Sequence, residues 1–187
     1  MRIVAGKYRS RTLKSLRGLV LRPTSDRLRE TLFNILGPTV EDSIFVDLYA
    51  GTGAVGIEAL SRGARKAIFI EKRSSAVKVI RGNLAALGIS TEAEILALDA
   101  VRGLELLSAR SAHAQFFFLD PPYAEKGEYE RALDFLDTSA LLTPGGCVIA
   151  EHRKRLPLPE RLSQLERIRL VEQGDAALSF YRLALAA

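Results

Sequence analysis

The chain has 187 residues, and 48% of them are hydrophobic, which suits one domain with a full core. A single cysteine excludes an intramolecular disulfide, two histidines argue against a metal centre, and no apolar run approaches a membrane span of about 20 residues. The net charge is +5, although residues 1–30 alone carry +7 (nine Lys and Arg against two acids), so residues 31–187 sum to −2. We therefore expect a cytoplasmic, metal-free protein with a locally basic surface.

The first predicted element is a basic N-terminal arm over residues 1–22, followed by a core over residues 23–187 in the same single domain. Gly6–Ser15 alternates basic with other residues and predicts a small hairpin. A local excess of positive charge is typical of a surface that contacts nucleic-acid phosphates. A solvated basic face without a partner is the alternative, and the acid-free N-terminus also has the composition of a transit peptide. The candidate phosphate contacts are Lys7, Arg9, Arg11, Arg22 and Arg27.

After the arm, the chain alternates helices and strands. The expected helices are Thr24–Leu36, Val55–Arg62, Ser74–Leu87, Val101–Ala109 and Glu128–Leu141. The expected strands are Ile44–Leu48, Ala67–Glu71, Ala93–Leu98, Phe116–Leu119 and Cys147–Ala150, with an antiparallel hairpin of Ile168–Glu172 and Ala177–Leu185 at the end. This order predicts an α/β fold with a mostly parallel sheet and helices on both faces. In Thr24–Leu36 the apolar face should pack on the core and leave Arg27 and Arg29 nearer the rim.

A glycine-rich turn joins the first core strand to its helix. The spacing Gly51-x-Gly53-x-x-Gly56 matches the dinucleotide fingerprint, in which the backbone approaches a ligand at a helix N-terminus. Glu71 closes the next strand, where a carboxylate can bind both hydroxyls of a ribose. These features alone are compatible with NAD, FAD or S-adenosylmethionine.

Asp47 favours one of these ligands. It lies at the end of the strand before the glycine turn, where a carboxylate would repel a pyrophosphate but attract the ammonium and sulfonium of S-adenosylmethionine. Asp99 follows the third strand and could meet the adenine amino group. Each acid also has a plainer interpretation: a turn or helix-cap acid for Asp47, an exposed strand-end charge for Glu71, and a turn acid for Asp99.

The run Asp120-Pro121-Pro122-Tyr123 follows the apolar strand Phe116–Leu119. Two prolines fix a stiff, extended loop with no backbone donors. The Asp120 carboxylate and the Pro121 carbonyl can both accept from one planar NH₂ group, while Tyr123 stacks on the ring that carries it. This arrangement fits the exocyclic amine of a nucleobase, which is a poor nucleophile and has to be positioned to attack a methyl donor. The alternative is a turn that only ends a strand.

Residues 44–71 and 116–123 resemble the motifs of class I S-adenosylmethionine-dependent methyltransferases. Together with Arg22–Asn34 and with Glu58-Ala59-Leu60-Ser61-Arg62-Gly63-Ala64, they resemble the RsmD family of bacterial 16S ribosomal RNA guanine-N2 methyltransferases. The resemblance implies a Rossmann-like fold with seven strands, and a guanine base bound at Asp120, Pro121, Pro122 and Tyr123. It also implies S-adenosyl-L-methionine as cofactor, 16S rRNA in the small ribosomal subunit or its assembly intermediate as partner, and a monomer. The expected cofactor contacts are Asp47, Tyr49, Gly51, Thr52, Gly53, Glu71, Lys72, Asp99 and Ala100.

Other functions remain open at this stage. The same chemistry could act on adenine N6 in DNA or RNA, or on a protein glutamine. A nicotinamide-dependent oxidoreductase would share the glycine spacing, but Asp47 and the Pro-Pro loop oppose it. A non-enzymatic RNA-binding protein on a methyltransferase scaffold is the third alternative. Cys147 lies in a predicted apolar strand, which indicates packing and argues against cytosine-C5 methylation, since that reaction needs a cysteine nucleophile in a substrate-facing loop.

Overall fold

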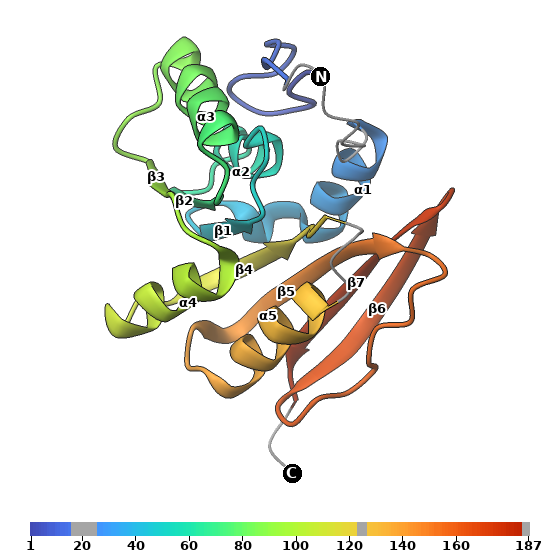
Figure 1. Cartoon of the computed structure of the whole chain (residues 1–187). Coiled ribbons are helices and arrows are strands. Elements are labelled where there is room, and N and C mark those ends of the chain that lie inside the picture. The colour runs from blue at the N-terminus through green and yellow to red at the C-terminus, as the bar shows by residue number, and fades with distance from the viewer. Residues whose placement is uncertain (16–25, 123–126, 185–187) are drawn as a thin grey trace.

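The computed structural model describes residues 1–15, 26–122 and 127–184, and it shows a seven-stranded sheet between two layers of helices (Figure 1). The strands are β1 (Ile44–Leu48), β2 (Lys66–Ile70), β3 (Ala93–Leu96), β4 (Ala114–Leu119), β5 (Leu142–Arg153), β6 (Leu165–Gln173) and β7 (Ala176–Leu183). The helices are α1 (Asp26–Leu36), α2 (Ala54–Ser61), α3 (Ser74–Leu87), α4 (Ala100–Ala109) and α5 (Gly127–Thr138), with a 3₁₀ turn η1 (Gly37–Val40). The predicted fold class is confirmed.

The strand order in the sheet is β3-β2-β1-β4-β5-β7-β6. Strands β1 to β5 are parallel, whereas β7 is antiparallel to both β5 and β6. Strand order reverses at β1, because β2 continues on one side of it and β4 on the other. In open α/β sheets ligands bind at the carboxyl ends of the strands beside such a reversal. The fold therefore places the ends of β1 and β4 at the expected binding edge.

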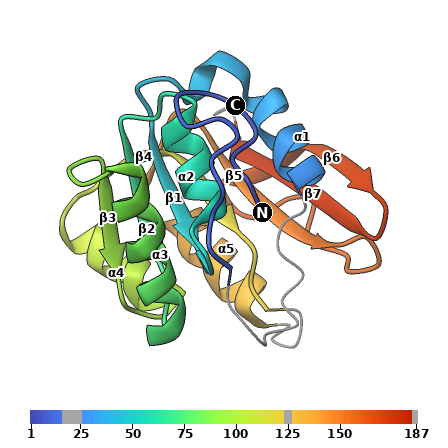
Figure 2. The same cartoon turned by 90° about the horizontal axis from the view of Figure 1, so that it is seen from above.

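Each face of the sheet has its own hydrophobic core. One core packs the arm, α1, α2 and α3 against Phe45, Phe69, Phe116 and Phe118. The other packs α4 and α5 against the alternate residues of the same strands, among them Val46 and Phe117. Figures 1 and 2 show these two helix layers on opposite sides of the sheet. Strands buried on both faces explain why β1, β2 and β4 are nearly continuous apolar runs.

Most element boundaries agree with the prediction to within two residues, and β5 is the main exception. It runs for 12 residues, from Leu142 to Arg153, where the sequence predicts Cys147–Ala150. The segment Thr143-Pro144-Gly145-Gly146 has the composition of a turn, and it forms an irregularity in the pairing with β4, between the pairs Ala114–Leu142 and Phe116–Cys147. A Cβ at Gly146 would lie 2.7 Å from the carbonyl oxygen of Gln115, so the glycine permits this close approach. Cys147 is buried as predicted, and burial raises the pKa of its thiol to about 12.

The arm is a hairpin that packs on α2 and α3 (Figure 2). Arg2 pairs with Thr12, and residues 6–10 form the turn, so the hairpin begins before the predicted Gly6–Ser15. Gly6 has φ of +82°, and a Cβ there would lie 1.8 Å from the carbonyl oxygen of Ser61. No other residue type fits this contact, because both the backbone conformation and the space require glycine.

The prediction that Arg29 lies near the rim is wrong. Arg29 is fully buried and donates hydrogen bonds to the carbonyl of Arg2, to Asp26 (2.9 Å) and to Glu58 (3.4 Å). Glu58, also fully buried on α2, accepts from the backbone N–H groups of Val4 (2.8 Å) and Ala5 (3.0 Å). The physical reason is that the buried Glu58 carboxylate needs a cation and donors. Arg29 and the arm supply them, which no periodicity in α1 reveals.

Candidate active site

The glycine turn between β1 and α2 has the backbone that its sequence predicts. Gly51 and Gly53 have φ of +55° and +78°, and Gly53 is the N-cap of α2. A Cβ at Gly56 would lie 2.4 Å from the Phe69 ring, so this glycine lets α2 pack closely on β2. Tyr49 also has a positive φ of 64°, which is rare for an aromatic residue. The turn thus presents backbone N–H groups at a helix N-terminus, where a nucleotide-like ligand can approach.

Asp47, on β1, stabilises the start of α2 directly after this turn. Its side chain is buried, and its Oδ2 accepts a hydrogen bond from the Gly56 N–H at 2.9 Å. Burial raises the pKa of Asp47 from 3.8 to about 7, the Gly56 hydrogen bond opposes that rise, and the charge of Glu71 adds to it. The carboxylate therefore has a structural task that sequence reasoning gave only as an alternative. A cation bound beside it would relieve the unfavourable burial of its charge.

Glu71 joins the same turn from the end of β2. One carboxylate oxygen accepts from the Gly51 N–H at 2.8 Å, and the other accepts from the backbone N–H of Arg73 at 2.9 Å. The Arg73 guanidinium completes an ion pair with it at 3.0 Å. The guanidinium also donates to the first oxygen at 3.3 Å, so each oxygen accepts two hydrogen bonds. Ribose hydroxyls that replaced the partly exposed Arg73 side chain would find these two acceptor positions open, while the backbone contacts of Glu71 to the Gly51 and Arg73 N–H groups stayed in place.

Thr52, at the middle of the turn, contacts the arm through Asn83. The buried Asn83 side chain of α3 donates to the Thr52 carbonyl at 3.0 Å and to the Lys14 carbonyl at 3.2 Å, and it accepts from the Lys14 N–H at 2.8 Å. Met1 lies on the same side, with its sulfur 4.0 Å from the Thr52 hydroxyl. One side chain thus connects the arm, α3 and the candidate cofactor turn.

Asp99 and Ala100 begin α4 at the end of β3. Asp99 is the N-cap residue, and its carboxylate accepts from the Arg102 N–H at 3.1 Å. Its side chain is 46% exposed, so it can also reach a ligand. Ala100 is buried, and its side chain packs in the core on the α4 face of the sheet. Asp99 is therefore a helix-capping acid, which neither the proposed adenine contact nor the alternative of a turn acid predicts.

Asp120 follows β4 at the same edge and is partly buried. Burial raises its pKa well above 3.8, and the neighbouring charges of Glu151 and Asp47 add to the rise. Pro121 is buried and Pro122 is partly buried. The predicted cofactor acids Asp47 and Glu71 and the predicted substrate acid Asp120 therefore share one electrostatic environment. Tyr123 and Arg22 lie outside the described residues.

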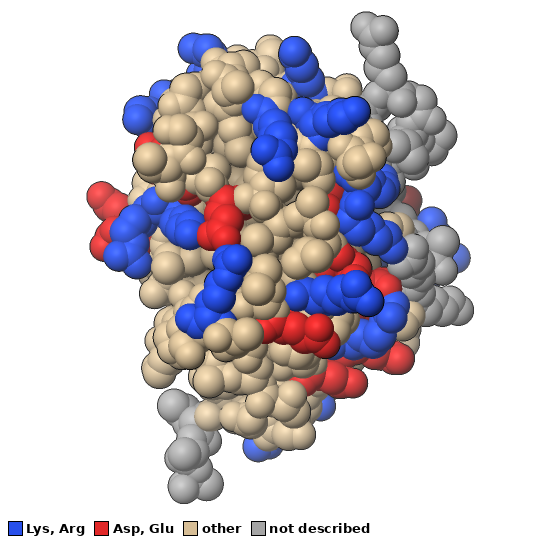
Figure 3. All heavy atoms as spheres, turned by 60° about the vertical axis from the view of Figure 1, so that its left-hand side comes forward, with Lys and Arg blue, Asp and Glu red and all other residues tan. Residues whose placement is uncertain are grey.

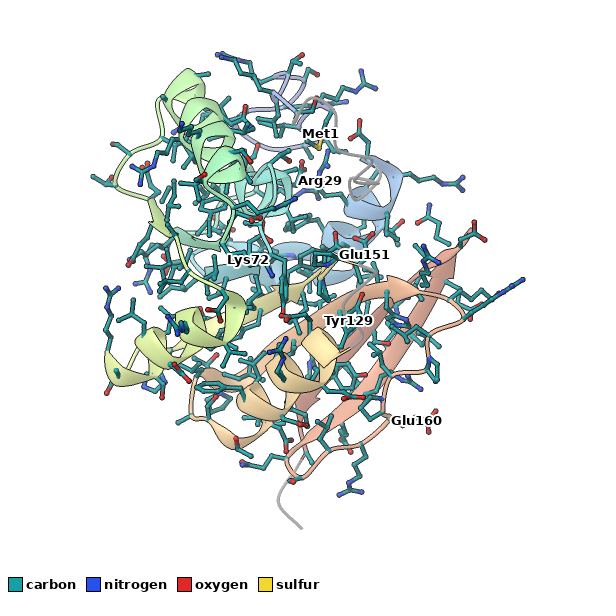
Figure 4. The ribbon with its side chains drawn as sticks, in the orientation of Figure 1. Met1, Arg29, Lys72, Tyr129, Glu151 and Glu160 are labelled. Carbon is teal, nitrogen blue, oxygen red and sulfur yellow. The ribbon has the colours of Figure 1, made fainter. Side chains whose placement is uncertain are left out.

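Sequence reasoning missed the residues that support this edge from α5 and β5. Tyr49 donates from its hydroxyl to the Glu128 carboxylate at 2.8 Å, which joins the cofactor turn to the start of α5. Tyr129, the next residue, donates to the Glu151 carbonyl at 2.7 Å. Figure 4 shows Tyr129 and Glu151 in the middle of the molecule. Glu151 is buried beside Asp120. In the sequence Glu151 directly follows the predicted apolar strand Cys147–Ala150, much as Glu71 closes the strand Ala67–Glu71. An acid at the end of an apolar strand was therefore the signal that could have identified Glu151.

The predicted phosphate contacts lie elsewhere. Lys7, Arg9, Arg11 and Arg27 are exposed, as is the predicted cofactor residue Lys72. The Lys7 N–H donates to the Ser61 carbonyl and the Arg11 guanidinium to the Ala86 carbonyl, so the hairpin turn lies at the C-terminal ends of α2 and α3. These helix ends face away from the carboxyl edge of the sheet, because each helix returns antiparallel to its strand. The described residues contain no group of three or more His, Cys, Asp or Glu placed to hold a metal ion, and none of their helices could span a bilayer.

Comparison with known proteins places this chain in a family. The family model described as "Conserved hypothetical protein 95" matches residues 1–182. Ribosomal RNA small subunit methyltransferase D of Haemophilus influenzae is 37% identical over 98% of this chain and 92% of its own length. The protein of the same name from Escherichia coli K12 is 34% identical over 97% and 89%. The solved structure named "Putative methyltransferase yhhF from Escherichia coli" superimposes with a TM-score of 0.85, at 30% identity, covering 98% of this chain and 97% of that one.

Proposed function

We propose that this chain, which belongs to the RsmD family of ribosomal RNA small subunit methyltransferases, transfers a methyl group from S-adenosyl-L-methionine to the N2 amine of one guanine in 16S rRNA. The observation that carries the proposal is the convergence of Asp47, Glu71 and Asp120 at one sheet edge, beside the Gly51–Gly53 turn. Acids at this edge suit a cationic cofactor and an amine substrate, and they oppose the pyrophosphate of a nicotinamide cofactor.

The chain's own groups fit the cofactor. Glu71 would bind the ribose hydroxyls in place of the Arg73 guanidinium, and Asp47 would face the ammonium and sulfonium. The exposed carboxylate of Asp99 would accept from the adenine amine, with Tyr49, Thr52, Lys72 and Ala100 lining the site. When bound, the cofactor supplies the methyl group as a sulfonium.

The substrate amine would be held by the loop after β4. Asp120 and the Pro121 carbonyl accept from the two N–H bonds of the guanine N2 group and aim its lone pair, while Tyr123 stacks on the base, which enters flipped or unpaired. Orientation of this kind contributes about 7–11 kcal/mol in intramolecular models. The methylated amine must then lose one proton. Asp120 is suited to accept it, because burial and neighbouring acids raise its pKa and so make it a stronger base than an exposed aspartate.

The partner follows from the substrate. The enzyme would act as a monomer on the small ribosomal subunit or an assembly intermediate, in the cytoplasm where subunits mature. A preformed ribosomal surface would present the guanine in place, whereas protein-free rRNA would have to be ordered at a cost in binding energy. No metal takes part in the proposed reaction.

The test uses labelled S-adenosylmethionine with three substrates: small-subunit particles that lack the modification, protein-free 16S rRNA, and duplex DNA. Nucleoside analysis identifies the product. We expect N2-methylguanine, chiefly from the particles. N6-methyladenine would overturn the proposal in favour of an adenine methyltransferase. Stabilisation of the protein by NADH and not by S-adenosylhomocysteine would overturn the cofactor assignment.

A further inference from the structure

The described lysines and arginines differ in whether they form ion pairs. Many of those outside the arm and α3 are paired with carboxylates within 4.0 Å. These pairs include Arg62–Glu58, Arg65–Asp42, Lys66–Glu94, Arg102–Asp99, Arg110–Glu94, Arg131–Glu128, Lys154–Glu172 and Arg167–Glu160. By contrast, seven exposed cations of the arm and α3 form no ion pair with any described residue. They are Arg2, Lys7, Arg9, Arg11, Lys14, Lys78 and Arg81, and we call them the arm–α3 surface.

The arm and α3 are held together by direct hydrogen bonds. Asn83 binds both the N–H and the carbonyl of Lys14, and one turn later the Arg11 guanidinium donates to the Ala86 carbonyl at 3.1 Å. Lys78 and Arg81 are exposed on the same helix, between these contacts and its N-terminus at Ser74. The cations of the two segments therefore lie on two elements that are hydrogen-bonded to each other, with Lys78 and Arg81 on the solvent-facing side of α3.

Acids are missing from both segments. Residues 1–15 and 72–91 contain no aspartate or glutamate. Figure 3 shows this side of the molecule: its uppermost part carries mainly Lys and Arg, and in its middle and lower parts acids lie among further Lys and Arg side chains. A group of cations without neighbouring carboxylates attracts a polyanion, because the phosphates of a polyanion supply the negative charges that the protein does not.

We propose that the arm–α3 surface binds the sugar–phosphate backbone of the ribosomal RNA beside the modified guanine; this rests on the proposed function. The 14 residues of α3 extend for about 21 Å, and its N-terminus follows Glu71 directly at the candidate cofactor site. The surface thus runs from the hairpin turn, remote from the catalytic edge, toward that edge. The chain's N-terminal charge excess indicates only the first half of it.

A protein or membrane partner fits this surface less well. The exposed large hydrophobic residues of the described chain are Ile168 and Leu170, and both lie on β6 at the opposite end of the sheet order from β3. Protein interfaces and membrane-surface helices both need a buried apolar centre. A surface of cations and small residues supplies none, and the phosphate backbone requires none.

The experiment compares two double variants with the same change in net charge. Lys78→Gln with Arg81→Gln removes two cations of the arm–α3 surface and keeps helix-forming side chains. Arg155→Gln with Arg161→Gln is the matched control, because both residues are exposed, form no ion pair with a described residue, and lie between β5 and β6. Binding of unmodified small-subunit particles is measured as a function of salt, without cofactor. Methyl transfer and S-adenosylhomocysteine affinity are measured separately.

Each phosphate that a side chain neutralises adds roughly 0.7–0.9 to the slope of log K against log salt. We expect the slope of the Lys78/Arg81 variant to fall by about 1.4–1.8 from the wild-type value, with a higher KM for particles, an unchanged kcat and unchanged S-adenosylhomocysteine affinity. The control should keep the wild-type slope. Equal slopes for the two variants would overturn the proposed surface even if the wild type is active. A wild type that binds particles but transfers no methyl group would count against the proposed function and not against the surface.

Discussion

The carboxyl edge of the sheet and the arm–α3 surface use charge in opposite ways. At the edge, Asp47, Glu71 and Glu151 are buried, and the first two hold backbone N–H groups of the cofactor turn. On the arm–α3 surface the cations are exposed and have no described ionic partners. Burying an acid costs desolvation free energy unless specific donors satisfy it, so its position is fixed. An exposed cation stays solvated and can contact an anion from several positions. The difference indicates that chemistry depends on a few fixed acids, and RNA affinity on several replaceable cations.

The largest effect should come from the substrate acid of the edge. Asp120→Ala should lower methyl transfer by at least about 100-fold, because the amine loses its acceptor and its orientation. Calorimetry with S-adenosylhomocysteine should find the affinity within a few-fold of the wild type, since Glu71 and the glycine turn remain. Asp134→Ala, on the exposed side of α5, is the control. Loss of cofactor binding in Asp120→Ala would place this residue in the cofactor site instead.

The second effect concerns Asn83, which connects the two regions. Asn83→Ala would leave the Thr52 carbonyl and the Lys14 N–H without their buried partner. We expect a loss of about 1–3 kcal/mol in the free energy of unfolding, together with weaker cofactor binding, measured by denaturation with and without S-adenosylhomocysteine. Lys14→Gln keeps both backbone contacts and is the matched control. If Asn83→Ala unfolds like the wild type, the arm and the turn are independent.

The third effect is a pH dependence centred on Asp47. Because its pKa is raised from 3.8 to about 7, the free protein loses stability as pH rises from about 4 through 7. A cationic cofactor favours the ionised acid, so its affinity should rise about 10-fold between pH 6 and pH 8 as the proton is released. Asp47→Asn should weaken binding at pH 8, remove most of this rise, and raise the melting temperature of the free protein. A variant with the wild-type pH profile would show that another group titrates.

The smallest effect should come from the contact between Tyr49 and Glu128. Tyr49→Phe removes the hydroxyl that donates to the Glu128 carboxylate but keeps the ring. We expect a decrease of about 2- to 5-fold in kcat, because α5 starts beside the substrate loop. This corresponds to the lower part of the range of roughly 0.5–1.5 kcal/mol for one hydrogen bond. Glu128→Gln preserves an acceptor and should come close to wild type. A similar loss in both variants would indicate that the charge of Glu128 matters more than the hydrogen bond.

The sequence predicted the parts of this molecule that depend on local chemistry. The strand before Gly51, the turn itself and helix α4 follow from apolar patterning and glycine spacing, and all three are present. Asp47, Glu71 and Asp120 come together because each lies at the end of a parallel strand, and parallel strands bring their carboxyl ends to one edge.

The predictions that were wrong or missing concern residues whose contact partners are distant in the sequence. Arg29 has the charge of a surface residue, but it is buried because Glu58, 29 positions later, is buried beside it. Asn83 and Glu128 have no motif, and their roles arise from contacts with Lys14 and Tyr49 that are far away in the sequence. Lys78 and Arg81 lie in an ordinary helix. Only the packing of the arm on α3 makes them part of a larger basic surface.

The position of β7 has a consequence for how the chain folds. β7 lies between β5 and β6, so β6, which is made earlier, has no neighbour in the sheet until β7 is complete. β5, which carries Glu151, likewise keeps an open edge until then. During synthesis these unpaired edges would be open to aggregation. The strands that carry Asp47, Glu71 and Asp120 pair without β7, so the candidate active-site edge can form first, and the β5–β7–β6 part of the sheet closes afterwards.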